Sequence, residues 1–521
     1  GLCAFEKRDS RIFMNCACES CFMHAVRVCG RVNGEGSNVN KPCMYNGIVN
    51  AGDAHRHIQY RPLLQFLASQ ERNVVWLLLG IALLPVDGTT LGLYAPFWSP
   101  ISPALFAVYC LCNWRQLRIV ANRYLPLFLL PVICVVLSVP GWVRFGFHLN
   151  AAFMSVTGLL GMLATLAALA IAFDRKQIPW RMPLRILIAS YWCSFAVGVV
   201  QWAGLKTKFT PIINYFKHLM YREYIELGSV WGGGRVQFLF AEPSYIGMHL
   251  FGILLPLMWL MRGRDRIYAK RLRDLVVVYA CGAVLMHAGA RIVVDSVVAL
   301  LIAIVVQVRW NDRRQRVRGT CAFVGMTALG VCGMLANHRL ASIVRLGAMG
   351  DSSFFARIYQ SLDPLCGFVA HPWMAFTGFG AGNIYTAMQN GDSIAERMLN
   401  GLGMDGHLAV GFVDQVNVNS VWTMCAYTSV VVEYGLIGMV LLVIASLACA
   451  SKISTYGDTV RSADGRMAVG GNGCGSVGGR TIWHKTTFCW LILLSYLYVQ
   501  CENYAFAALP LFVFAARKTR P

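Results

Sequence analysis

The chain has 521 residues, of which 57% are hydrophobic and only 14% are charged, and its mean hydropathy is +0.53. Soluble domains carry about 25% charged residues, so this composition excludes an ordinary soluble protein. The formal net charge is +21, which taken alone would favour a nucleic-acid-binding protein. The placement of that charge along the chain indicates membrane topology instead, and no nucleic-acid partner is expected.

Residues 1–73 are polar, rich in cysteine and without periodicity, and we expect a disordered cytoplasmic tail there. Within it, Cys16, Cys18, Cys21 and His24 form a C-x-C-x-x-C-x-x-H pattern. This spacing matches no standard zinc site, so we predict no metal centre. Many of the other cysteines lie inside apolar segments, where cysteine behaves as a small hydrophobe.

The remainder of the chain consists largely of apolar blocks close to the roughly 20 residues that a helix needs to cross a bilayer. These blocks predict an all-α polytopic membrane protein with about twelve transmembrane helices. They are 74–95, 97–113, 124–139, 151–173, 184–204, 238–261, 274–290, 292–308, 319–336, 420–450, 486–501 and 503–516. The pair within 274–308 also fits a single broken helix.

The blocks divide the chain into transmembrane helices 1–9 over 74–336, a large loop over 337–419, and transmembrane helices 10–12 over 420–516. Within the last part, 451–485 contains the Gly-rich stretch GRMAVGGNGCGSVGGR, whose composition is typical of a flexible linker.

Positive charge is unevenly divided between the two sets of loops. One set contains 26 Lys and Arg in about 84 residues, and the other contains 11 in about 128 residues. The first set is 114–123, 174–185, 262–273, 309–318, 451–485 and 517–521; the second is 140–150, 205–237, the turn at 291 and 337–419. Since cytoplasmic loops carry the excess of Lys and Arg, the first set and both termini are predicted to be cytoplasmic.

Four arginines lie on the side where this rule predicts few cations: Arg144, Arg235, Arg291 and Arg357. Arginine keeps its charge and binds phosphate with a planar, bidentate fork. A group of arginines at the outer headgroup level suits a pyrophosphate attached to a lipid. The alternative for each of them is a side chain that extends to lipid headgroups.

Glu242 precedes Pro243, which is tolerated in a helix only in the first turn. We therefore expect a helix to begin near Pro243, with Glu242 at or just before its N-cap, where the helix dipole stabilises a carboxylate. Glu242 then has two interpretations. It is either a structural cap paired with Arg235, or a base or orienting group that acts on a substrate hydroxyl.

The large loop ends in G-x-G-x-G at Gly378, Gly380 and Gly382. As a phosphate-binding loop this motif is weak, because no strand precedes it. His371, before Pro372, is a candidate phosphate donor or base, although a lone histidine in an exposed loop more often has neither role.

Asn417 and Asn419 are expected at the start of the next helix. Glu433 would then lie about 20 Å along that helix. A carboxylate at such depth is costly in a bilayer, so we expect either a partner for it or a helix that begins outside the membrane.

Four segments resemble, in the expected order, the O-antigen polymerase/ligase superfamily of bacterial inner membranes. They are RVQFLFAEPS (235–244), GARIVVDSVVALLIAIV with Arg291, RIYQSLDPLCGFVAHPWMAFTGFGAGN with Arg357, and NSVWTMCAYTSVVVEYGLIG with Asn419. The first is similar to the family element Arg-x-x-Gly-x-Phe-x-x-Pro, and its E-P-S form looks more like the polymerases. The resemblance covers about 235–440, and Arg144 matches an outer basic residue more weakly.

The resemblance implies a GT-C-like membrane fold with 337–419 as a periplasmic loop, and a metal-independent glycosyltransferase without cofactors. Its substrates would be undecaprenyl-pyrophosphate-linked glycans, and its partners membrane lipids, a chain-length regulator and a flippase. Arg235 and Arg291 would hold the pyrophosphate, with Arg291 and Glu242 as catalytic residues. Arg357, Arg144, His371 and Asn419 would complete the substrate-binding set.

Two departures favour a polymerase over an O-antigen ligase. Ligases carry a histidine just before the last motif helix, where this chain has Asn417 and Asn419, and the ligase glycine after Arg235 is Phe238 here. The ligase nevertheless stays an alternative. So does a polysaccharide-unit flippase, although no internal repeat of the kind that transporters show is evident.

Overall fold

The computed structural model describes residues 73–86, 101–220, 224–226, 234–262, 265–286, 288–336, 338–421, 423–463 and 489–499. The predicted tail as far as residue 72, its Cys-His pattern, the linker beyond residue 463 and the predicted span 503–516 lie outside these residues.

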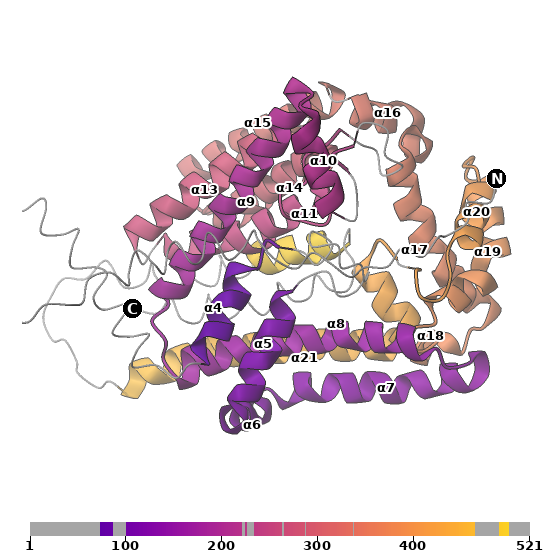
Figure 1. Ribbon diagram of the computed structural model, residues 1–521, viewed down its shortest axis with the longest axis horizontal. Coiled ribbons are helices and arrows are strands. Elements are labelled where there is room, and N and C mark those ends of the chain that lie inside the picture. Colours follow the sequence, from indigo (N-terminus) through magenta and orange to yellow (C-terminus); the bar gives the residue numbers. More distant parts are fainter. Residues whose placement is uncertain are drawn as a thin grey trace, which may run out of the picture. The chain divides into compact units, whose positions relative to one another are not determined.

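All regular elements within the described residues are helices, which confirms the all-α expectation (Figure 1). The helices of the first half are α4 (Val74–Ala82), α5 (Ser102–Cys112), α6 (Trp114–Arg123), α7 (Leu125–Phe145), α8 (Leu149–Ala170), α9 (Arg181–Thr207) and α10 (Thr210–Leu219). Those of the second half are α11 (Pro243–His249), α12 (Leu255–Met261), α13 (Arg266–Leu285), α14 (Ala290–Gln307), α15 (Arg313–Ala336), α16 (His338–Leu346), α17 (Ser352–Ala370), α18 (Met374–Thr377), α19 (Ile384–Gly401), α20 (His407–Gln415) and α21 (Ala426–Ala463).

Short π-helical turns extend two of these elements. Ile171–Arg175 continues α8, and Leu250–Leu254 joins α11 to α12. A further helical segment covers Cys489–Tyr498. The predicted pair within 274–308 is two helices, because Gly289 has a φ of 149° and separates α13 from α14.

Five helices within the described residues are long and apolar enough to cross a membrane: Leu125–Phe145, Leu149–Arg175, Arg181–Thr207, Arg313–Leu335 and Ala426–Ala448. Each overlaps a predicted span. Shorter apolar helices cover Ser102–Cys112, Pro243–Trp259 and Cys489–Tyr498. Together with the composition, these helices support an all-α membrane protein.

Several boundaries differ from the prediction. The predicted span 124–139 is six residues too short, so Arg144 lies in the last turn of α7 instead of in a loop. Residues 337–419, predicted as a large loop between spans, contain the five α-helices from α16 to α20. The helix expected at Asn417 begins only at Ala426, so Glu433 lies about 10 Å along it, at 1.5 Å per residue.

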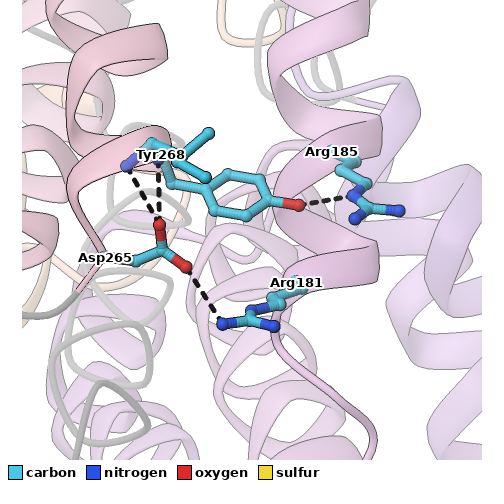
Figure 2. A network of polar contacts seen from close by, with 5 residues as sticks. Arg181, Arg185, Asp265 and Tyr268 are labelled. Carbon is cyan, nitrogen blue, oxygen red and sulfur yellow. Dashed lines mark hydrogen bonds and ion pairs between the residues drawn. The ribbon is translucent and has the colours of Figure 1, made fainter. Parts of the chain in front are cut away.

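The basic loops predicted to be cytoplasmic contact one another. Figure 2 shows Asp265, the N-cap of α13, accepting hydrogen bonds from the backbone N–H groups of Ile267 and Tyr268. Arg181 at the start of α9 donates to Asp265 at 3.1 Å, and Arg185 donates to the Tyr268 hydroxyl. These bonds hold the first turns of α9 and α13 together.

A third basic segment joins the same end of α9. Arg175, just before α9, donates to Gln116 of α6 at 3.2 Å, and Arg123 lies 4.0 Å from Asp174. The segments 114–123, 174–185 and 262–273, which the charge distribution assigned to one side, therefore lie at one end of the helices that they connect.

Candidate functional site

The helix α11 begins at Pro243, as predicted from the Glu-Pro-Ser sequence. Glu242 is the N-cap of α11, with an extended backbone, and Pro243 occupies the first helical position. Ser244 Oγ donates a hydrogen bond to Glu242 Oε2 at 2.8 Å. Because α11 packs against α14, and the position of a Cβ on Gly289 would lie 3.9 Å from Pro243 Cβ, the N-termini of the two helices are neighbours.

Arg291, in the first turn of α14, forms an ion pair with Asp295 one turn further along. Arg291 Nε lies 3.3 Å from Asp295 Oδ2, and the Arg291 side chain is 12% exposed while that of Asp295 is 0% exposed. The Tyr496 hydroxyl donates to Asp295 Oδ1 at 2.9 Å. The buried carboxylate is therefore held by one cation and one neutral donor.

A second predicted arginine, Arg357, lies near enough to Asp295 to stabilise its negative charge. The positive charge of Arg357, from α17, acts on Asp295 together with that of Arg291. Arg357 Nη1 also donates to the backbone oxygen and the hydroxyl of Ser353, both at 2.6 Å, which fixes its guanidinium against the first turns of α17. Arg291 and Arg357, distant in sequence, thus both lie near Asp295, although the ion pair is made by Arg291, and we call Arg291, Asp295, Arg357 and Tyr496 the Asp295 cluster.

The approach of α11 to this cluster depends on a glycine. A Cβ at Gly247 would lie 2.5 Å from Asp295 Oδ2, closer than real Cβ contacts allow. Gly247 therefore lets the backbone of α11 pass directly beside the carboxylate. As a result α11, α14 and the Cys489–Tyr498 helix meet around one buried charge.

Arg235 lies in the irregular segment 234–242 that leads into α11. Its backbone N–H donates to Tyr224 O at 2.9 Å, and its guanidinium carbon lies 5.1 Å from the centre of the Tyr224 ring. Gln201 of α9 fixes the residues that follow, since its Oε1 accepts from the N–H groups of Gln237 and Phe238, and its Nε2 donates to Phe238 O. The segment that carries Arg235 is thus bound to α9 by the buried side chain of Gln201.

Three other predicted residues have their contacts elsewhere. Arg144 is exposed, with its guanidinium carbon 5.6 Å from the Phe145 ring centre. His371 Nε2 lies 3.0 Å from Asn390 Oδ1, and its ring is edge-on to Phe145 at 5.0 Å. Asn419 is exposed in the turn before α21, where its N–H donates to Asn417 Oδ1. None of these contacts joins the Asp295 cluster.

The G-x-G-x-G motif packs backbone against backbone instead of forming an open loop. Gly378, Gly380 and Gly382 all have positive φ, and the N–H groups of Phe379 and Gly380 donate to Val432 O and Glu433 O of α21. Any Cβ at Gly378 would lie 2.3 Å from Glu433 backbone atoms. The glycines therefore provide close packing on α21.

The buried carboxylate of Glu433 has hydrogen-bond donors for both of its oxygens. Its Oε1 accepts from the Gly382 N–H at 2.9 Å, and its Oε2 accepts from the Ser155 hydroxyl, which also contacts the Tyr434 hydroxyl. These bonds link α8, α21 and the glycine motif. They give Glu433 a structural role in the junction of these three elements.

A third buried carboxylate, that of Asp363, lies between α17 and α19. Both carboxylate oxygens of Asp363 are buried without a hydrogen-bond partner among the described residues, as is one oxygen of Asp392. Burial, and then the charge of Asp392, raise the pKa of Asp363 to about 8. Burial, followed by the charges of Asp414 and Glu396, also raises the pKa of Asp392.

Neither Asp295 nor Tyr496 was among the predicted site residues. The signal for Asp295 was present, because charges four residues apart on a helix face one another and Asp295 is four residues after Arg291. No comparable pattern marks Tyr496, which lies 201 residues from its partner.

The Asp295 cluster is suited to an anion. Two guanidinium groups, which keep their charge at any physiological pH, lie near the start of α14, where the helix dipole adds positive potential. No group of three or more His, Cys, Asp or Glu that could hold a metal ion occurs in the described part of the chain.

Comparison with known proteins assigns the chain to no family. No protein-family model matches the chain, and no curated protein matches its sequence.

Proposed function

We propose that this membrane protein polymerises undecaprenyl-pyrophosphate-linked oligosaccharide repeat units at the periplasmic face of a bacterial inner membrane. The observation that carries the proposal is the Asp295 cluster, where Arg291 forms an ion pair with a buried carboxylate beside α11, and Arg357 lies near enough to act on the same carboxylate. A pyrophosphate ester is a dianionic ligand that two guanidinium groups can grip through bidentate hydrogen bonds.

In the proposed reaction, a sugar hydroxyl of one repeat unit attacks the anomeric carbon of a second lipid-linked glycan. The new C–O bond forms as the bond between that carbon and the pyrophosphate oxygen breaks, and the pyrophosphate leaves with the electron pair. Arg291 and Arg235 stabilise the charge that develops on the leaving group. Glu242 accepts the hydroxyl proton or orients the attacking group, and Arg357 grips donor or acceptor.

The conformation of Phe238 supports the resemblance on which the proposal draws. Phe238 has a φ of 58°, a left-handed conformation that favours glycine. The superfamily element carries glycine at this position, so the segment between Arg235 and Pro243 keeps a backbone that glycine would adopt without strain. The buried Phe238 ring lies over Gly198 of α9, where a Cβ would be 2.0 Å from it.

The proposal includes the finer fold: about twelve transmembrane helices in a GT-C-like arrangement, with both termini cytoplasmic. The contacts among basic loops at one end of α9 agree with this topology. A chain-length regulator and a flippase are the proposed protein partners.

Deletion of the gene from its native host tests the class of activity. Loss of a polymerase leaves one repeat unit on the final acceptor. Loss of a ligase leaves none while polymer accumulates on the carrier lipid, and loss of a flippase traps units on the cytoplasmic side. Either of the last two phenotypes would replace the polymerase proposal with the corresponding alternative.

Complementation with point variants tests the site. Arg291→Ala and Arg235→Ala should abolish the ladder of repeat lengths while the protein still inserts at wild-type level. Arg291→Lys should also fail, because an ammonium group lacks the bidentate fork. The matched control is Arg397→Ala, since Arg397 is an exposed arginine of α19 whose side chain donates to Ser393 O. A normal ladder from Arg291→Ala would refute the assignment.

A further inference from the structure

A stripe of exposed apolar residues runs along α7 to its last turn. Val132, Val136, Val139 and Val143 are exposed large hydrophobics spaced four, three and four residues apart, so they share one helix face. Because α7 is long and apolar enough to cross a membrane, this face is suited to lipid. Its last member, Val143, is 82% exposed.

Further exposed apolar residues lie in the segments next to the end of α7. Phe147, in the turn between α7 and α8, and Leu149, the first residue of α8, are exposed. Val369 in the last turn of α17, and Trp373 and Phe376 at α18, are exposed as well, with Trp373 at 79% exposure. We call these five residues and Val143 the α7–α18 patch. Six large apolar side chains in such a position form the kind of exposed apolar surface that marks an interaction site.

Hydrogen bonds and a ring contact fix the segment around α18 to the end of α7. The Trp142 indole donates to Ala381 O at 2.9 Å, and the Asn383 amide donates to Gly146 O at 3.1 Å. The ring of Phe145 meets that of His371 edge-on at 5.0 Å. These contacts join the end of α7 to the segment that follows α17, and α18 packs against α7 (Figure 1).

Composition distinguishes lipid from protein as the occupant of this surface. The patch begins at Val143, the last residue of the lipid-suited stripe of α7, and it contains the exposed Trp373 next to α18. Arg144, also exposed, follows Val143 in the last turn of α7. Tryptophan concentrates at membrane–water interfaces, where its ring lies at the headgroup level. Arginine at a helix end extends its guanidinium toward lipid phosphates.

We propose that the α7–α18 patch is a membrane-interface anchor. In this arrangement Val143, Phe147, Leu149, Val369, Trp373 and Phe376 lie at the boundary between lipid headgroups and acyl chains. Arg144 then contacts lipid phosphate, not the substrate. The anchor holds the segment between α17 and α19 on the bilayer surface, and it does not depend on the proposed enzymatic function.

Tryptophan fluorescence of the full-length protein in lipid nanodiscs tests the anchor. Two nanodisc preparations contain phosphatidylcholine brominated near the headgroup or near the acyl-chain end, and acrylamide is added from the aqueous phase. The contribution of Trp373 among the 14 tryptophans is the difference between wild type and Trp373→Phe. The control is Trp490→Phe, because Trp490 is fully buried and its indole donates to Gly252 O.

We expect the Trp373 contribution to be quenched about twofold more by bromine near the headgroup than by bromine near the chain end, as for interfacial tryptophan. The Trp490 contribution should be quenched by neither lipid. Quenching of the Trp373 contribution by acrylamide alone would place it in water and overturn the proposal. Protection from both lipid bromine and acrylamide would show a protein cover, from a second copy or a partner, and would overturn it equally.

Discussion

Asp363 shows how burial changes a single carboxyl group in the segment between α16 and α21. Its ordinary pKa is 3.8, and in the folded protein burial and Asp392 raise that pKa to about 8. Between these values the folded state holds a proton that the unfolded state releases. The free energy of unfolding therefore falls as pH rises through this window, by at most about 1.4 kcal/mol per pH unit, and levels off above pH about 8.

Asp363→Asn should remove this slope and raise the stability of α17 and α19 at alkaline pH, because a neutral amide replaces a buried charge. Hydrogen exchange of peptides from α17 and α19, followed from pH about 5 to about 8, measures the effect. Asp405→Asn is the matched control, since Asp405 is an exposed aspartate of the same region. An unchanged slope in Asp363→Asn would assign the pH dependence to another group.

Gln201 is a second residue whose role is visible only in three dimensions. Its side chain satisfies the backbone N–H groups of Gln237 and Phe238 and the carbonyl of Phe238. Gln201→Leu would leave these buried groups without partners, at about 1–3 kcal/mol for each unsatisfied group. We expect a lower midpoint of thermal unfolding in detergent and loss of polymer, because the hydrogen bonds that position the segment carrying Arg235 are lost.

The control for that experiment is Gln415→Leu, since Gln415 is an exposed glutamine at the end of α20. Equal thermal midpoints for Gln201→Leu and wild type would show that the segment before α11 does not depend on this side chain.

Single residues were predictable where covalent geometry decides their place. Pro243 can occupy only the first turn of a helix, and this places Glu242 at the N-cap, as the structure confirms. Asn417 and Asn419 were wrongly expected to begin a helix, because asparagine favours turns as strongly as caps. In the structure they form a turn in which Asn417 Oδ1 accepts from the Asn419 N–H.

At the scale of elements, the junction of α11 with α14 rests on the absence of one Cβ atom. Gly247→Ala would bring a methyl group to about 2.5 Å from Asp295 Oδ2, and either α11 or the carboxylate must move. Since Asp295 holds Arg291, we expect loss of polymer at least tenfold, about 1.4 kcal/mol of lost transition-state stabilisation. The ladder of repeat lengths and the level of inserted protein are the two measurements.

Gly252→Ala is the matched control in the same apolar segment. A Cβ there would be 3.5 Å from Leu497 and 3.6 Å from Leu494, which is ordinary contact with side chains. If Gly252→Ala and Gly247→Ala lose activity equally, the effect belongs to helix packing in general and not to the Asp295 cluster.

The elements found from the sequence are those whose apolar runs are long. The blocks near α7, α8, α9, α15 and α21 were recognisable because lipid demands continuous apolar residues along a helix. The five helices within 337–419 were missed, since helices such as α17 and α19 mix polar and apolar residues and bury only one side. Their packing on one another, through Gly367 and Gly391, creates no signal in a hydropathy profile.

At the scale of the whole described molecule, contacts between loops agree with the charge distribution. Segments 114–123, 174–185 and 262–273 contact one another through Arg175, Arg123 and Arg181. The loops assigned to the opposite side also meet, because Asn383 donates to Gly146 O. For the segments that make these contacts, the structure agrees with the grouping that the charge distribution predicted, although that distribution gave no information on the helices within the loops.

This agreement leads to a test of orientation by insertion of a protease-cleavable epitope at two exposed turns. One insertion follows Leu402, between α19 and α20, and the other follows Asn311, between α14 and α15. The excess of Lys and Arg in 309–318 predicts that the second turn is cytoplasmic.

In spheroplasts, protease added outside should cut the tag after Leu402 and leave the tag after Asn311 intact until the cells are lysed. The reverse pattern would invert the topology and place the Asp295 cluster on the cytoplasmic side, where a donor polymerised in the periplasm is not available. Cleavage of both tags before lysis would mean that α15 does not separate them by a membrane, which would contradict its assignment as a span.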